Sequence, residues 1–457
     1  MHLVDLTMFY AAEGGGVSTY LNAKSRWLAR QGRMRHTILS PNVDPGEAPA
    51  RLRVPGLALP GIHGYRMPLS VSAVARRLRT LRPDLIEVGD AGHCAWAALR
   101  ARERLSVPAV AFYHSDLPRL LQNRFGDAAA GISARYLARL YARFDLVLAP
   151  SRRMVEQLQA MGVHGALHQP LGIDSAVLHP CRRDPDFKAR LGLAPDVRLL
   201  VYAGRFTADK KLDVLLDALG RLGGGYHLLL VGSGEPLPLA PNTRLMPFQR
   251  DQRALARILA SCDLLVHPGD CETFGLIVLE AMGCGLPVVV TTGGGVSELV
   301  DDDCGVLARP NCADSLAAAV REACSRDLAL LGAQARRKVE RCFDWNQVFA
   351  QLMGRYEHLL ASHANSGQSA RQGAGQSARQ RVGQAEGQGE ECVAGQNAAR
   401  GEARTAPRGE ARTAARNVAR NVAQNAGRGT PASSADAPVI GAASSINDDR
   451  AETRYRR

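Results

Sequence analysis

The chain has 457 residues with a net charge of +13, and 46% of them are hydrophobic. This length is too great for one ordinary hydrophobic core and allows two domains and an appendage. No apolar run reaches the roughly 20 residues needed to span a bilayer, and no N-terminal secretion signal with a cleavage site is found. We therefore expect a cytoplasmic protein whose membrane contact, if any, is peripheral, at the inner face of the membrane.

The positive charge is unevenly distributed. Residues 1–180 carry 22 Lys and Arg against 13 Asp and Glu, whereas residues 181–361 carry 21 against 22. An anionic membrane surface would explain the basic first half. An arginine-rich proteome would explain it equally well, since 52 of the 57 basic residues are Arg.

The ten cysteines form no C-x-x-C pair and no cluster with histidines at metal-ligand spacing. We therefore expect reduced, mostly structural thiols. No D-x-D motif lies in a plausible place, because "DDD" at 301–303 follows a predicted helix end. The sequence predicts no metal site.

In chain order, short apolar strands alternate with helices. The first series runs through "HLVDLTM", "RHTILSP", "PDLIEVGD", "VPAVAFYHS" and "FDLVLAPS", and the second through "RLLVYAGR", "YHLLLVGSG", "DLLVHPG", "LPVVVTT" and "CGVLAR". Strands alternating with helices of ten or more residues form parallel sheets covered on both faces. We predict an α/β protein with two doubly wound, Rossmann-like domains facing a central cleft, at residues 1–180 and 181–344.

The end of the chain has a different composition. A helical pattern covers residues 345–361, and residues 362–457 repeat "GQSARQ", "RGEARTA" and "RNVA" with Tyr455 as the only aromatic residue. Such a segment cannot bury enough apolar area to offset its ordering entropy. We expect a disordered, low-complexity tail from residue 362.

Unusual residues follow several strands, at the edge where doubly wound sheets bind ligands. Arg205 and Lys210 follow one strand and provide the pair of cations expected for a diphosphate, although a solvated basic loop is an equal alternative. His114 follows another strand, where a packed or surface histidine is the more common outcome. Ser151 and Glu298 have the positions of ordinary helix-start residues.

One glutamate precedes a predicted helix that is apolar on every face, and a second lies inside it. In "GDCETFGLIVLEAMGCGLP", residues 269–287, seven residues separate Glu272 from Glu280. A helix apolar all round is buried, so Glu280 needs a partner. The glycines at 14–16 lead from a strand into a helix and could cradle an anion, although a tight turn fits nearly as well.

Together these motifs resemble the retaining GT-B glycosyltransferases of family 4 (glycosyl transferases group 1), which carry the E-x7-E motif. The resemblance covers nearly all of residues 1–360 and includes "PLGID" at 170–174, "VGSG" at 231–234 and "GGGVSEL" at 293–299. It implies that the helix at 345–361 crosses back to the first domain.

The resemblance also implies roles for the site residues. Glu280 accepts hydrogen bonds from the ribose hydroxyls, Glu272 contacts the donor sugar, and His114 approaches that sugar from the other domain. Arg205 and Lys210 neutralise the departing diphosphate. The remaining nucleotide-sugar contacts are Gly15, Gly16, Gly232, Phe274, Gly275 and Leu276.

The expected activity is hexosyl transfer, with retention, from a nucleotide sugar to a hydroxyl of a glycan or lipid-linked acceptor. "FYHSDLPR" and "HPGDCETFG" favour GDP-mannose as donor, whereas "LMPFQRDQ" in place of the usual F-x-G run leaves a UDP-sugar open. A glycoside hydrolase using both glutamates is a weaker hypothesis, because a neutral glycoside needs no diphosphate clamp. An inactive sugar-nucleotide-binding protein is the third. No separate cofactor, nucleic acid or metal is expected.

Overall fold

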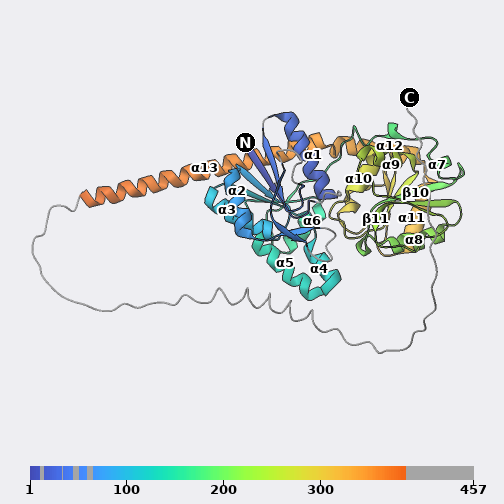
Figure 1. The fold of residues 1–457 in the computed structure, drawn as a ribbon, viewed down its shortest axis with the longest axis horizontal. Helices are drawn as coiled ribbons and strands as arrows, with labels where there is room; N and C mark the ends of the chain where they lie inside the picture. Colours follow the sequence, from blue (N-terminus) through green and yellow to red (C-terminus); the bar gives the residue numbers. More distant parts are fainter. Residues whose placement is uncertain (11–14, 33, 45–50, 59–64, 387–457) are drawn as a thin grey trace, which may run out of the picture. The chain divides into compact units, whose positions relative to one another are not determined.

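The computed structural model describes residues 1–10, 15–32, 34–44, 51–58 and 65–386 (Figure 1). The chain divides into two compact units, Met1–Gln380 and Arg381–Arg457, so both predicted Rossmann-like domains belong to the first unit.

The first sheet is parallel and has the order β3-β2-β1-β6-β7-β8-β9. Its strands are β1 (His2–Leu6), β2 (Arg35–Ser40), β3 (Arg51–Arg53), β6 (Leu85–Val88), β7 (Ala109–Phe112), β8 (Leu146–Ala149) and β9 (Leu167–His168). The order reverses at β1, which is the switch point of a doubly wound sheet. A short antiparallel pair, β4 (Gly56–Ala58) and β5 (Arg66–Pro68), lies outside this sheet.

The second sheet is also parallel, with the order β12-β11-β10-β13-β14-β15. Its strands are β10 (Arg198–Phe206), β11 (Tyr226–Gly234), β12 (Thr243–Met246), β13 (Leu264–His267), β14 (Val288–Thr291) and β15 (Gly305–Ala308). The order reverses at β10, and the neighbouring strand ends carry the cations and the glutamate loop. The prediction of two doubly wound parallel sheets is confirmed.

Helices connect most of the neighbouring parallel strands, as such crossovers require. The helices that precede the last strand are α1 (Gly16–Gln31), α2 (Val71–Leu81), α3 (His93–Leu105), α4 (Leu117–Phe125), α5 (Asp127–Tyr141), α6 (Arg152–Ala160), α7 (Phe187–Arg190), α8 (Leu212–Leu222), α9 (Gln252–Ser261) and α10 (Leu276–Gly283), and those that follow it are α11 (Ala313–Ser325), α12 (Leu328–Cys342) and α13 (Trp345–Glu386). Short 3₁₀ turns are η1 (Pro180–Arg182), η2 (Ala208–Lys210) and η3 (Gly295–Leu299).

Helix α13 follows the second sheet in the chain and contacts the first sheet. The Tyr356 hydroxyl donates to the Glu87 carboxylate on β6, and the Arg355 guanidinium donates to the His168 carbonyl at 2.8 Å. Figure 1 draws this helix in orange. The sequence predicts that it ends at 361, but it continues to Glu386. The reason is that Ala, Arg and Gln, which are frequent here, have high helix propensity even without a core. Residues 387–457 of the expected tail lie outside the described residues.

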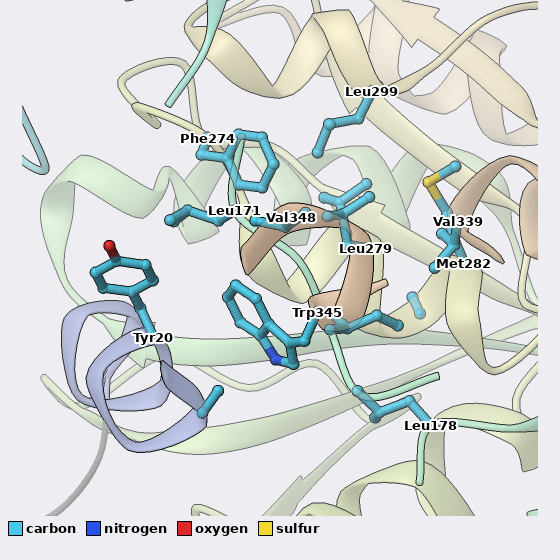
Figure 2. Packing of buried hydrophobic residues seen from close by; sticks show 14 of the residues in the cluster. Tyr20, Leu171, Leu178, Phe274, Leu279, Met282, Leu299, Val339, Trp345 and Val348 are labelled. Atoms are coloured by element: carbon cyan, nitrogen blue, oxygen red, sulfur yellow. The ribbon is translucent and has the colours of Figure 1, made fainter. Parts of the chain in front are cut away.

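One cluster of buried residues combines members of both sheets with the start of α13. Figure 2 shows Trp345 among them, near Tyr20 of α1 and Val348 of α13. The Trp345 ring stacks on Phe349 with centroids 4.6 Å apart and lies 6.2 Å from Tyr20. Buried aromatic contacts of this kind are worth about 0.5–1.5 kcal/mol each beyond their burial, so α13 contributes to the stability of the first unit.

Candidate active site

The Lys210 ammonium and the Glu272 carboxylate form an ion pair between two strand ends of the second sheet. Lys210 Nζ lies 2.6 Å from Glu272 Oε1, and Nε2 of His267, the last residue of β13, lies 3.3 Å from the same oxygen. Burial alone would raise the pKa of Glu272, but the Lys210 charge and His267 outweigh it and hold that pKa well below its usual range. Glu272 is therefore a carboxylate at neutral pH.

The Lys210 charge is fixed by the same neighbours. Burial would lower the pKa of Lys210, but Glu272 and Asp209, whose Oδ2 lies 3.2 Å from Nζ, raise it well above the usual value. Lys211 takes the left-handed conformation at φ 54° and starts α8. The two adjacent lysines are thus separated by a sharp turn, and only Lys210 reaches the glutamate.

Arg205 contributes an exposed cation at the carboxyl end of β10, the strand that precedes Lys210. It is the next-to-last residue of β10, and its main-chain carbonyl accepts a hydrogen bond from the Tyr202 hydroxyl at 3.0 Å. Within the described part of the chain, its guanidinium has no ion pair or hydrogen bond. This side chain is free to meet an anion.

Glu280 is the unpartnered acid that the sequence analysis expects. It lies inside α10 and is partly buried, and burial raises the pKa of its carboxyl to about 7. No group among the described residues forms an ion pair or side-chain hydrogen bond with it. A buried carboxylate without a partner costs free energy, so the role of Glu280 as a ligand contact stays a prediction that its environment favours.

His114 lies two residues beyond the end of β7 in the first sheet. Its ring stacks on Phe112 with centroids 4.2 Å apart, and burial lowers its pKa to about 3. The imidazole is therefore neutral at pH 7 and can donate or accept a hydrogen bond. Its main-chain carbonyl accepts a hydrogen bond from Thr273 Oγ1 at 3.0 Å, which places it next to the Glu272 loop.

The N-termini of α1, in the first domain, and α10, in the second, also lie close together. Gly16 is the first residue of α1, and a Cβ added to it would lie 3.4 Å from the Leu276 side chain, at the first residue of α10. Gly275 needs its φ of 94°, and Phe274 before it is buried. The N-terminus of a helix is a suitable place for an anion, so anion binding at these two helix starts stays a prediction. Gly15 precedes α1 with φ 140°, and Gly14 lies outside the described residues.

Gly232 has a packing reason to be glycine. It pairs with Gly204 across β10 and β11 and has φ 159°, and an added Cβ would collide with the Gly204 carbonyl. This close strand contact explains the glycine without a ligand, so its contact with the donor stays a prediction.

Sequence reasoning missed several contacts between the sheets. Ser151 caps α6 as expected, accepting from the Met154 N–H at 3.3 Å. Glu298, however, reaches the same helix start from the second sheet and accepts from the N–H groups of Arg152 and Arg153. Arg119 Nη2 lies 3.8 Å from Asp270 Oδ2. Charged residues in loops beside the glutamate motif were the available signal.

Among the described residues, no group of three or more His, Cys, Asp or Glu side chains could hold a metal ion. No described helix combines the length and apolar character that crossing a bilayer requires.

The two doubly wound parallel sheets have the fold of a glycosyltransferase of the GT-B type. The family described as "Glycosyltransferase Family 4" matches residues 14–176, and the family described as "Glycosyl transferases group 1" matches residues 197–326. The chain belongs to this family, and it is a hexosyltransferase with a nucleotide-sugar donor, as the sequence predicts.

The comparisons with individual proteins agree with this assignment. A Mycobacterium tuberculosis protein named GDP-mannose-dependent alpha-(1-6)-phosphatidylinositol dimannoside mannosyltransferase is 31% identical over 386 residues, covering 77% of this chain and 95% of the relative. A GDP-mannose-dependent alpha-mannosyltransferase from the same species is 29% identical, covering 70% and 87%. Sucrose-phosphate synthase from Thermosynechococcus elongatus has the same fold, with a TM-score of 0.68 at 21% identity, covering 79% of this chain and 100% of that one.

Proposed function

We propose that this enzyme transfers mannose from GDP-mannose, with retention and without a metal, to a hydroxyl of a glycan or lipid-linked acceptor. The observation that carries the proposal is Glu280, a partly buried carboxylate that has no partner among the described residues and lies on α10, the helix that follows the Glu272 loop. A ribose diol provides two hydroxyl donors for such a carboxylate. The names of the mycobacterial relatives support GDP-mannose as the donor.

The charges of the site suit a departing diphosphate. Arg205 offers an unpaired planar fork, and Lys210 is held in a fixed position by Glu272. When the bond between the sugar and the diphosphate breaks, negative charge grows on the diphosphate, and fixed cations stabilise that charge more than the ground state. These two cations can supply the stabilisation that a metal supplies in other transferases, which supports the proposal of metal independence.

Glu272 is better suited to hold a sugar than to act as a hydrolase acid. Its pKa lies well below the usual range, and Lys210 occupies one of its oxygens. The other oxygen is left for a donor-sugar hydroxyl. The ion pair therefore argues against the glycoside hydrolase, in which one of two carboxyls must carry a proton.

A membrane-side acceptor is part of the proposal. Helices α4 and α5 expose Leu120, Phe125 and Ile132 by 49%, 64% and 62%, with Arg124 and Arg135 also exposed. Apolar side chains together with arginines suit the surface of an anionic bilayer. Sedimentation with anionic and neutral vesicles tests this point, and binding that salt does not weaken would contradict the electrostatic part.

The decisive assay is the release of nucleoside diphosphate that depends on the donor. GDP release from GDP-mannose, faster than UDP release from UDP-sugars, is the expected result. Activity should survive exhaustive chelation, and NMR of the product should show the anomeric configuration of the donor. Preference for a UDP-sugar would replace the donor assignment, and an inverted product would remove the retaining mechanism.

A further inference from the structure

The segment 293–299, "GGGVSEL", has no place in the proposed donor contacts but joins the two sheets. Glu298 Oε2 accepts from the Arg152 N–H at 2.9 Å, and Oε1 accepts from the Arg153 N–H at 2.6 Å. These are the first two residues of α6, which follows β8 of the first sheet. A helix start leaves four N–H groups free and favours negative charge. The second sheet thus supplies a two-oxygen cap for a helix of the first.

The same segment packs tightly on the loop that carries Glu272. The Gly295 N–H donates to the Glu272 carbonyl at 2.6 Å. A Cβ added to Gly293 would lie 2.6 Å from Asp270 Cβ, and one added to Gly294 would lie 2.5 Å from the Glu272 carbonyl oxygen. There is no free space between the two loops, so a displacement of one displaces the other.

The Glu272 loop also contacts the first sheet directly. Thr273 Oγ1 donates to the His114 carbonyl at 3.0 Å, and Arg119 Nε lies 3.5 Å from Cys271 Sγ. The Thr273 bond is a single neutral one, and Arg119 is 44% exposed, which weakens its contribution. Glu298, by contrast, makes two charge-assisted hydrogen bonds to a helix of the first domain, and such bonds are roughly twice as strong as neutral ones.

We propose that Glu298 is a positioning residue that holds the Glu272 loop of the second domain against α6 of the first. Through this cap it fixes Glu272 and Lys210 relative to His114. The inference rests on the proposed function, because it gives the distance between these groups a catalytic meaning. Glu298 itself has no contact with the donor in this scheme.

Three variants test the proposal. Glu298→Ala removes both acceptors, and turnover should fall by about 10²-fold, the loss that a displacement of about 1 Å can cause. Affinity for free GDP should fall far less than turnover, because Arg205 and Glu280 lie in the second domain and keep their positions. Glu298→Gln keeps one acceptor oxygen and should give a smaller loss. Ser151→Ala is the matched control, because it removes the other cap of the same helix start. It should lower the melting temperature but keep turnover.

The outcomes separate positioning from simple helix stability. A loss of turnover in Glu298→Ala, with a much smaller loss of GDP affinity and a normal Ser151→Ala enzyme, supports the proposal. Wild-type turnover in Glu298→Ala, an equal loss of turnover in Ser151→Ala, or a loss of GDP affinity as large as the loss of turnover overturns it. If Glu298→Ala does not fold, the same comparison is made with Glu298→Gln.

A second measurement does not depend on the donor assignment. Hydrogen exchange over residues 269–275 should become faster in Glu298→Ala than in Ser151→Ala, since only the first variant frees the loop. Equal exchange in the two variants overturns the inference. If the wild-type protein releases no nucleoside diphosphate from any sugar nucleotide, the proposed function fails, and this exchange experiment still decides whether Glu298 holds the loop.

Discussion

Glu280→Gln should weaken nucleotide binding and stabilise the empty enzyme at the same time. Burial raises the pKa of Glu280 from 4.5 to about 7, and each unit corresponds to about 1.4 kcal/mol, so the ionised carboxylate costs the folded state at most about 3.5 kcal/mol. Between these two pKa values the folded state binds more protons than the unfolded chain. The contribution of Glu280 to the free energy of unfolding therefore falls as the pH rises from 4.5 to 7 and is constant above that range.

The pH therefore separates the two effects of this substitution. The variant should melt at a higher temperature than the wild type at pH 8, and at nearly the same temperature at pH 4. Affinity for free GDP should fall by roughly 1–3 kcal/mol at pH 8, because the amide offers one acceptor oxygen instead of two. Wild-type affinity should itself rise as the pH passes 7 and the carboxyl ionises.

Calorimetry with GDP and thermal melts at both pH values check these expectations. Glu357→Gln, at an exposed acid on α13, is the control and should change neither quantity. Unchanged GDP affinity in Glu280→Gln would refute the ribose assignment. A lower melting temperature at pH 8 would show that the carboxylate has a stabilising partner.

Glu272→Gln should lower turnover while leaving affinity for free GDP nearly intact, because its proposed partner is the sugar; equal losses of GDP affinity in this variant and in Glu280→Gln would contradict separate roles. Arg205→Ala should cut turnover by roughly 10²-fold, and near-normal turnover at saturating donor would remove it from the diphosphate clamp. Lys210→Ala should be at least as severe, because it also leaves Glu272 without its ion-pair partner; the pH dependence of turnover should then show a new acidic group with a higher pKa. Deleting residues 387–457 should leave the melting temperature and GDP release unchanged, and a large drop in melting temperature would show that this segment packs on the folded part.

The parallel sheets could be predicted because their strands are continuous apolar runs between helices of normal length. The E-x7-E block was equally informative, since Glu280 in an apolar helix required a partner that the described residues do not provide. The end of α13 could not be placed, because Ala, Gln and Arg favour a helix while their lack of apolar surface favours disorder. The cap by Glu298 depends on which loops of two domains meet, and local patterns do not contain that information.

The largest feature that the sequence analysis did not predict is a buried ionic cluster in the first domain. Lys24 Nζ lies 2.8 Å from both Asp5 Oδ1 and Glu87 Oε2, and all three side chains are at most 2% exposed. Two strands that otherwise read as apolar each carry an acid, and Lys24 is the only lysine in the first 180 residues, so a signal was present.

This cluster also explains how α13 is held on the first sheet. Tyr20 and Tyr356 both donate to Glu87, so helices α1 and α13 share one carboxylate. Replacing a buried ion pair by apolar residues is often neutral, whereas removing one partner costs about 3–5 kcal/mol. The cluster therefore contributes less to net stability than to the choice of one docking position, because a shifted α13 would deprive Glu87 of the hydrogen bond from Tyr356. The centroid of the Tyr20 ring lies 6.2 Å from that of Trp345 on α13 and 5.2 Å from that of His114. The docked position of α13 therefore also supports His114, whose carbonyl contacts the Glu272 loop.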